Sequence, residues 1–158
     1  MKLKQPETAT AVFHRDLSPD MAYLADGAIP YITISSKVGG YLNPDLMNAR
    51  DKLDLRRRVA AMELADKAKL DYVAAMDKTT RTDGEDRFAA IYDFCVTEWK
   101  TNIIDDASGE AIEANKDNFL GLAGVRVPEI AAAFTAFARY VDDVANYVRK
   151  ADEETEKN

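Results

Sequence analysis

The stretch YITISS, residues 31–36, decides that this chain is not wholly helical. Its residues alternate, with Ile32 and Ile34 on one side and Tyr31 on the other, which is the pattern of a short β-strand. A second stretch rich in β-branched residues, ETATAVFH at residues 7–14, predicts another strand. Because two strands alone are only marginally stable, we expect this small sheet to pack against a helix or to pair with another chain.

The segment between the two predicted strands contains Ser-Pro, Asp-Gly and a second proline. It predicts a loop with one helical turn around Met21–Leu24. From residue 43 onward the pattern becomes helical, since Asn43 is a favourable N-cap and Pro44 suits the first helical position. Residues 45–77 contain no glycine or proline, so they predict one long helix, straight or bent. Its far half, residues 66–80, has few apolar side chains and is expected to project into solvent.

A second helix is predicted to begin near TDGE, residues 82–85, which has the spacing of a capping box. Its apolar side chains recur every three or four positions and would form one buried face that ends near Lys100. These side chains are Phe88, Ile91, Tyr92, Cys95 and Trp99.

The remaining residues predict a turn and two further helical segments. The sequence DDASGE, residues 105–110, is a turn signal, and a short hairpin around it is one interpretation. Residues 115–124 predict one or two helical turns that end at Gly124. Pro128 opens the last helix, and the charged tail after Lys150 is expected to fray. The apolar face of that helix consists of Ile130, Phe134, Phe137, Val141, Val144 and Val148.

These segments predict an α+β fold that is mainly α-helical, with a small N-terminal β element followed by three principal helices and a short helical turn. We expect a β-containing portion at residues 1–42, a helical domain at 43–150 and a flexible charged tail at 151–158. The whole length of 158 residues suits one domain.

The charge balance limits the classes of partner that the protein could bind. The chain has 28 Asp and Glu residues against 21 Lys and Arg, for a net charge of −7. This surplus argues against nucleic acid and against an anionic membrane surface. The single cysteine excludes an internal disulfide and favours the cytoplasm. We find neither the apolar segment of a signal peptide nor an apolar run of membrane-spanning length.

The sequence offers few residues for catalysis or metal binding. His14 is the only histidine, which excludes a site with two histidine ligands from one chain, and we interpret it as a surface or edge residue. Cys95 lies on a predicted buried face, where a thiol is unreactive. The carboxylates Asp105, Asp106 and Glu110 lack the ligand spacing and the glycine of a calcium loop. We therefore expect no enzymatic activity, no cofactor and no metal.

Candidate contact residues remain on the predicted surface. Tyr31, Ile32 and Ile34 on an exposed edge strand could add to the sheet of a partner. Tyr140 and Tyr147 lie off the main apolar line of the last helix and form a second candidate contact face.

The only basic cluster is Arg56–Arg58. On a helix these three side chains point in different directions, so we expect them to pair with carboxylates such as Asp54 and Glu63.

The layout of the chain resembles the tail assembly chaperones of long-tailed bacteriophages. Residues 94–134, FCVTEWKTNIIDDASGEAIEANKDNFLGLAGVRVPEIAAAF, carry the resemblance. There a predicted helix leads into Trp99, and an acidic-glycine turn and polar stretch follow at residues 105–118. The closing helix begins with VPEIAAAFTAFARYV, residues 127–141.

This resemblance implies a non-enzymatic role in virion assembly in the cytoplasm of the host cell. Members of the family bind the tape measure protein, keep its long helix soluble and help to recruit the major tail protein. Self-association is compatible with such a role. The alternative is a structural virion protein, such as a neck or tail-completion component. A regulatory role, in which the protein binds a host factor, is a further alternative. A role in binding a small ligand would require a pocket with convergent polar groups.

Overall fold

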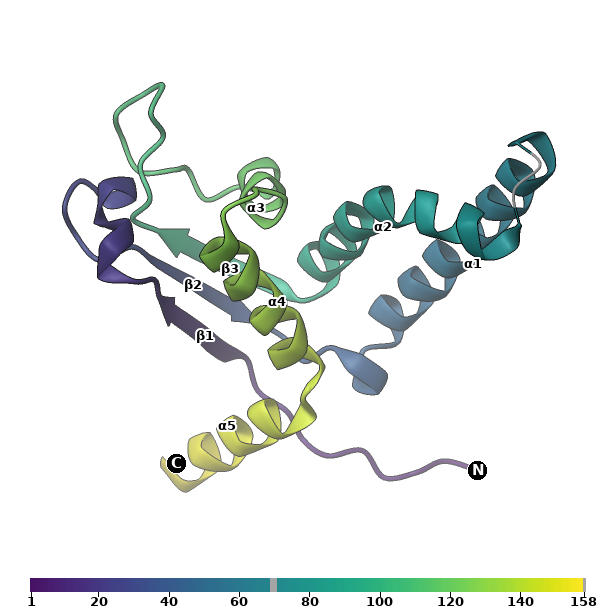
Figure 1. Cartoon of the computed structure of the whole chain (residues 1–158). Coiled ribbons are helices and arrows are strands. Elements are labelled where there is room, and N and C mark those ends of the chain that lie inside the picture. The colour runs from purple at the N-terminus through teal and green to yellow at the C-terminus, as the bar shows by residue number, and fades with distance from the viewer. Residues whose placement is uncertain (69–70, 158) are drawn as a thin grey trace.

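The computed structural model describes the backbone of residues 1–68 and 71–157, and the side chains of these residues except 79–83 and 157. The described residues form a three-stranded antiparallel sheet with packed helices, and a helical hairpin extends away from them (Figure 1). This confirms the predicted α+β class with mainly helical content. In chain order the elements are β1 (Ala11–Asp16), the 3₁₀ helix η1 (Pro19–Ala25), β2 (Tyr31–Ser36), the 3₁₀ helix η2 (Gly40–Leu42), α1 (Pro44–Ala68), α2 (Tyr72–Phe94), β3 (Val96–Thr101), α3 (Lys116–Ala123), α4 (Pro128–Asp142) and α5 (Val144–Lys157).

The sheet has the strand order β1–β2–β3, so β2 is the central strand. Its third strand comes from the middle of the chain and pairs with β2, with Lys100 opposite Thr33. One hydrophobic core therefore joins residues on both sides of the boundary that the sequence suggested at residue 42.

One face of the sheet is covered by helices. Phe13, Ile34 and Trp99 are neighbours across the three strands and belong to the core. Phe137 of α4 packs on Phe13 with ring centroids 5.6 Å apart, and Phe119 of α3 packs on Trp99 at 5.7 Å. The alternation at residues 31–36 is thus realised as one buried and one open side of the sheet.

The predicted helix across Trp99 is wrong, because α2 ends at Phe94 and Trp99 lies on β3. The backbone carbonyl of Cys95 accepts a hydrogen bond of 2.8 Å from the Lys37 N–H, and strand pairing begins at the next residue. The apolar spacing of three and four fits a helix locally, but pairing with β2 determines the conformation here.

The single long helix predicted for residues 45–77 is also wrong. The structure has two helices, α1 and α2, side by side as a hairpin (Figure 1). Asp71 caps the second helix, since its carboxylate accepts a hydrogen bond of 2.8 Å from the Ala74 N–H. That helix runs through residues 82–85, where the sequence predicted a start, and part of the predicted capping box lies outside the described side chains. The far end of the hairpin points away from the sheet, as the sequence suggested (Figure 1).

The last predicted helix is divided in two at Asp143, whose backbone is extended. The Asp143 carboxylate accepts a hydrogen bond of 3.1 Å from the Ala145 N–H and so starts α5. Instead of fraying after Lys150, the chain continues α5 to Lys157.

Several local predictions are confirmed. The Asn43 side chain caps α1 by accepting a hydrogen bond of 3.1 Å from the Leu46 N–H. The short hairpin around residues 105–110 forms, with an isolated bridge between Ile104 and Ala111. The helical turn near Met21 is η1, and α3 ends at Gly124.

Candidate functional site

The α1–α2 hairpin carries the most distinctive exposed feature of the described residues, an apolar row on the outer side of α1. Leu55, Val59 and Met62 are 61%, 46% and 62% exposed, although all three are large apolar residues. Their spacing of four and three places them on one side of the helix. We call these three residues the outward row.

The outward row faces away from the α1–α2 contact. The buried residues of α1 are Leu46, Leu53 and Ala61, which lie on the opposite side of the helix by their spacing. Since α1 already buries that side, the hairpin itself leaves no partner for the outward row. Contiguous exposed apolar side chains of this kind are typical of binding surfaces.

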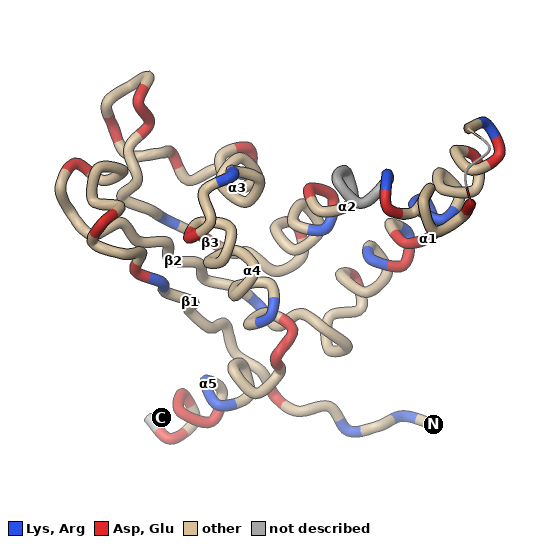
Figure 2. Tube along the Cα trace, in the orientation of Figure 1, with Lys and Arg blue, Asp and Glu red and all other residues tan. Residues whose placement is uncertain are grey.

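Basic and acidic positions are interspersed along α1 (Figure 2). Lys52, Arg56 and Arg58 are all exposed, and we call them the basic flank. None of the three makes an ion pair with another described residue. Other arginines of this region do have acidic partners in the chain: Arg50 pairs with Asp142 at 2.9 Å and Arg87 pairs with Asp54.

For Arg56 and Arg58, the predicted pairing with carboxylates does not form among the described residues. Asp54 pairs with Arg87 of α2 rather than with its neighbours in α1. Arg57 lies toward α2 and donates a hydrogen bond of 3.3 Å to the Met76 carbonyl. Arg56 and Arg58 are both exposed, and Arg56 also lines the groove between α1 and α2.

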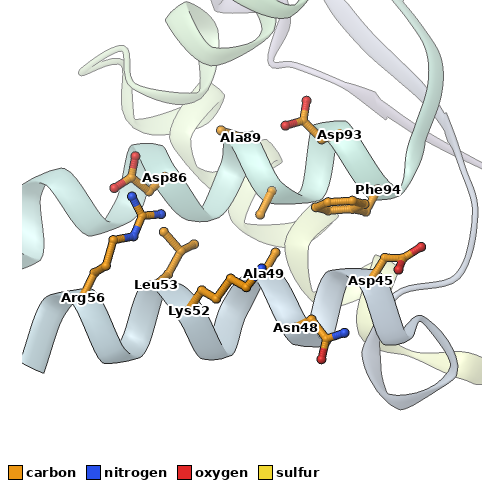
Figure 3. Close-up of a pocket in the computed structure, with 11 residues that line it drawn as sticks. Asp45, Asn48, Ala49, Lys52, Leu53, Arg56, Asp86, Ala89, Asp93 and Phe94 are labelled. Atoms are coloured by element: carbon orange, nitrogen blue, oxygen red, sulfur yellow. The ribbon is translucent and has the colours of Figure 1, made fainter.

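An open groove of about 460 Å³ runs between α1 and α2 beside the basic flank (Figure 3). In Figure 3, Arg56 extends from α1 toward α2, and Lys52 lies along the groove. Phe94 lies near one end. The remaining lining residues are Asp45, Asn48, Ala49, Leu53, Asp86, Ala89, Ala90 and Asp93.

The residues that line the groove are better suited to binding the side chains of a partner protein than to catalysis. Its small apolar residues leave room for a partner's side chains, while charged residues line both of its helices. Asp93 is already paired with Lys116 at 2.8 Å. The groove and the outward row adjoin each other on α1, so together they form one surface that a partner helix could contact.

The contact residues predicted on β2 are not at an edge of the sheet. Ile32 and Ile34 are 1% and 0% exposed, because β2 is the central strand and its apolar side packs under the helices. Their predicted role in strand addition is corrected, since both backbone edges of β2 are occupied by β1 and β3. Tyr31 is half-buried on the other side, where its ring lies 5.6 Å from that of His14.

The predicted contact face at Tyr140 and Tyr147 lies mostly inside the molecule. Tyr147 is 0% exposed, and its hydroxyl forms a hydrogen bond of 2.7 Å with Ser36. Burial raises the pKa of Tyr147 strongly and that of Tyr140 as well. Tyr140 is half-buried and packs edge-on against Phe13. The break at Asp143 turns Tyr147 onto a separate helix, so the two tyrosines do not form one exposed stripe.

His14 lies on the open face of the sheet and has partners on both ring nitrogens. Its Nδ1 lies 2.7 Å from Thr33 Oγ1, and its Nε2 lies 2.9 Å from Asp16 Oδ1. Thr33 comes from the neighbouring strand, whereas Asp16 lies two residues away on the same strand. The His14 side chain is exposed on the open face of the sheet, and the described pockets do not include it.

Cys95 is buried as predicted, and burial raises the pKa of its thiol to about 11. A thiol with so high a pKa is protonated at neutral pH and is a poor nucleophile. Among the side chains that the structure describes, no three His, Cys, Asp or Glu residues gather as a metal ion would require.

The outward row was not identified from the sequence, because its residues were assigned to a single long helix. Leu55, Val59 and Met62 form an apolar stripe on the side of α1 opposite its buried residues. The neighbouring Arg56 and Arg58 were the signal that could have marked this second side as distinct.

Comparison of the chain with protein-family models, with curated proteins and with solved structures finds no match. Among the described residues no single helix has the length and the apolar composition of a membrane span, whereas α3 and α4 meet both criteria only as a bent pair.

Proposed function

We propose that this protein is a non-enzymatic tail assembly chaperone of a long-tailed bacteriophage, which binds the tape measure protein and helps to recruit the major tail protein. The observation that supports a binding role is the outward row of α1, where Leu55, Val59 and Met62 are exposed without an intramolecular partner. The assignment to phage tails comes from the resemblance of residues 94–134.

A helical partner suits this surface. Helices commonly bind a helix or groove through apolar side chains spaced three and four apart. The outward row has this spacing, and the adjoining α1–α2 groove could take further side chains of the same partner. A tape measure protein, with its long helix, offers many such segments.

The proposed role also places the protein in the host cytoplasm, with neither nucleic acid nor a membrane as partner. The net charge of −7 supports the exclusion of nucleic acid, because phosphate binding requires a basic surface. Self-association stays compatible with the proposal.

Co-expression with the tape measure protein of the same phage tests the proposal. We expect the tape measure protein to remain in the soluble fraction and to co-purify with the tagged chain. A triple variant with Leu55→Gln, Val59→Gln and Met62→Gln should lose most of this capture, while glutamine keeps the helix propensity of α1 high.

A matched control replaces three exposed apolar residues away from the hairpin: Tyr23→Gln, Ile29→Gln and Tyr41→Gln. It should retain capture. If the wild-type chain captures no tape measure protein, the proposal is wrong. Mass spectrometry of purified virions distinguishes the chaperone from the alternative, a structural virion protein. A structural virion protein stays in the mature particle, and a chaperone does not.

A further inference from the structure

We propose that two copies of this chain associate edge to edge through β3, so that their two three-stranded sheets continue as one antiparallel sheet. The copies would be related by a two-fold axis that passes beside Trp99, which is the commonest symmetry of homodimers. This inference goes beyond the proposed function, which permits self-association but does not require it.

The direction of the backbone groups of β3 follows from its pairing with β2. The carbonyls of Tyr31 and Ser35 point toward β3, because they accept hydrogen bonds of 2.7 and 3.0 Å from side chains of that strand. Backbone groups alternate in direction along a strand, so Thr33 also faces β3 and its partner Lys100 faces β2. Trp99, the neighbour of Lys100, therefore directs its N–H and C=O away from β2, at the outer edge of the sheet.

This outer edge has no partner within the fold. Among residues 1–68 and 71–157, no group forms a hydrogen bond with the Trp99 N–H or C=O on that side. The segment that leads into α3 contacts Trp99 through its side chain, since the indole Nε1–H donates a hydrogen bond of 3.2 Å to the Asn115 carbonyl. An unpaired strand edge of this kind is a template for another strand.

The other edge strand, β1, is less available. The Tyr140 hydroxyl of α4 lies 3.5 Å from the Val12 carbonyl, and the Ala9 N–H donates a hydrogen bond of 3.2 Å to the Tyr147 carbonyl of α5. A strand added along β1 would have to displace these contacts. The free edge of the sheet is therefore β3.

The side chains of β3 indicate a second copy as the occupant of this edge. Glu98 and Lys100 are both exposed and lie on either side of Trp99. When two β3 strands pair in antiparallel fashion with Trp99 opposite Trp99, each Glu98 lies opposite the partner's Lys100. The N–H and C=O groups of the two Trp99 residues then form a hydrogen-bonded pair, which matches their outward direction.

Neighbouring registers are unfavourable. A shift by two residues places Glu98 opposite the partner's Glu98, or Lys100 opposite the partner's Lys100. A shift by one residue breaks the match of the pleat and of the hydrogen-bond direction. The register centred on Trp99 is the one in which charge and backbone direction agree.

No nearby charge cancels this complementarity within the sheet. The residues of β2 that lie beside Glu98 and Lys100 are Ser35 and Thr33, which carry no charge. Neither Glu98 nor Lys100 forms an ion pair with another residue that the structure describes. A strand with charges of only one sign would meet a like charge at one of the two positions, whereas a second copy meets none.

Sedimentation velocity of the full-length chain, combined with hydrogen exchange followed by NMR, tests the inference. Because the contact is short, we expect a weak dimer that forms at about 100 µM and above. At about 1 mM the Trp99 amide should exchange at least about threefold more slowly than in dilute solution, since it gains a hydrogen bond that the monomer lacks. The Lys100 amide, which faces β2 in both states, should change little.

Charge exchange between the two positions provides the matched variants. Glu98→Lys alone and Lys100→Glu alone each place like charges opposite each other, and each should weaken the dimer at least about tenfold. An equimolar mixture of these two variants restores opposite charges in both pairs and should form a heterodimer. The double variant Glu98→Lys with Lys100→Glu should dimerise as the wild-type chain does.

Two controls make the same changes of net charge away from the sheet. Glu7→Lys and Lys4→Glu lie in the exposed N-terminal segment and should leave the dimer unchanged. Circular dichroism of each variant shows whether the fold is retained.

The inference is overturned if the wild-type chain stays monomeric at about 1 mM, or if a dimer forms without protection of the Trp99 amide. It is also overturned if the mixture of the two single variants associates no better than either variant alone. Each measurement uses this chain alone, so these outcomes are distinct from a failure to capture the tape measure protein, which would remove only the proposed function.

Discussion

At the scale of single residues, the hydroxyl of Tyr147 links α5 to the central strand of the sheet. It forms a hydrogen bond of 2.7 Å with the Ser36 hydroxyl, and both side chains are buried. Among the described side chains, no buried polar atom lacks such a partner. A buried hydroxyl without a partner is costly, so this pair fixes the position of α5.

Replacing Tyr147 by phenylalanine leaves the Ser36 hydroxyl without its partner. We expect Tyr147→Phe to lower the free energy of unfolding by about 1–3 kcal/mol. Urea denaturation measures the change. The double variant with Ser36→Ala removes both hydroxyls and should lose less than the sum of the two single variants. Additive losses would show that the two hydroxyls are not coupled.

Cys95 gives a pH dependence with a definite sign. Burial raises the pKa of its thiol from 9.0 to about 11, so folding favours the neutral form. The stabilisation of the folded state by the neutral thiol is fully present below pH 9 and is lost as the pH rises toward 11. Between pH 9 and 10 we expect the free energy of unfolding to fall by about 1 kcal/mol from this group. Tyr140 and Tyr147, whose pKa values burial also raises from 10.0, add a smaller loss in this range and most of theirs above pH 10.

The variant Cys95→Ala isolates this contribution. It should be less stable at neutral pH because of the cavity, but its stability should fall less between pH 9 and 10. Urea denaturation at pH 8, 9 and 10 compares the two proteins. Equal slopes would contradict a thiol that is buried in the folded state.

Single residues with strong local preferences were predictable from the sequence. Asn43 caps α1, and Gly109 has a φ of 74° in the turn at residues 105–110. Both roles depend on the nearest neighbours in the chain. The pairing of His14 with Thr33 and that of Tyr147 with Ser36 were not predictable, because each partner comes from an element distant in sequence.

At the scale of elements, the junction after β2 requires a residue without a side chain. A Cβ atom on Gly39 would lie 3.0 Å from the Val141 carbonyl oxygen and 3.1 Å from Leu46 Cδ2. The Gly39 N–H also donates a hydrogen bond of 2.8 Å to that carbonyl. The end of α4 and the start of α1 therefore meet at this glycine.

Two glycine substitutions should change stability in opposite directions. Gly39→Ala should lower the free energy of unfolding by about 1–3 kcal/mol, because α4 or α1 must shift. Gly121→Ala in α3 meets no atom within 4 Å and should raise it by up to about 1 kcal/mol through helix propensity. Thermal denaturation of each variant measures its change in stability. Stabilisation by Gly39→Ala would mean that the two helices are not in contact there.

Elements were predictable where local pattern and tertiary contacts agree. The strand at residues 31–36 and the helix that begins at Pro44 were both found. Trp99 was misplaced because its apolar spacing fits a helix, whereas its conformation depends on pairing with β2. The division at Asp143 was missed because the valines on either side continue the apolar spacing of α4.

At the scale of the whole molecule, the core and the hairpin differ in how much they bury. Phe119 lies at the centre of the core, and its ring contacts Tyr92, Trp99, Phe134 and Phe137. In α1, beyond Leu53, Ala61 is the only buried side chain. The sequence suggested few apolar side chains only for residues 66–80, and the exposure of the outward row depends on α2 covering the other side of α1.

This contrast predicts a gradient of local stability along the hairpin. Alanine burial contributes much less free energy than burial of a large apolar side chain, so the outer part of α1 should open without unfolding the sheet. We expect amides of residues 55–66 to exchange with an opening free energy at least about 2 kcal/mol below that of Ile32 and Ile34. Native-state hydrogen exchange followed by NMR measures each amide.

Partner binding should remove part of this gradient. A helix docked on the outward row would bury Leu55, Val59 and Met62, so a helical segment of the tape measure protein should slow exchange in residues 55–66 and leave Ile34 nearly unchanged. The triple Gln variant of the outward row serves as the control, because its exchange should not respond to that segment. Equal protection of the outer hairpin and the sheet in the free chain would contradict the gradient, since the whole molecule would then open as one cooperative unit.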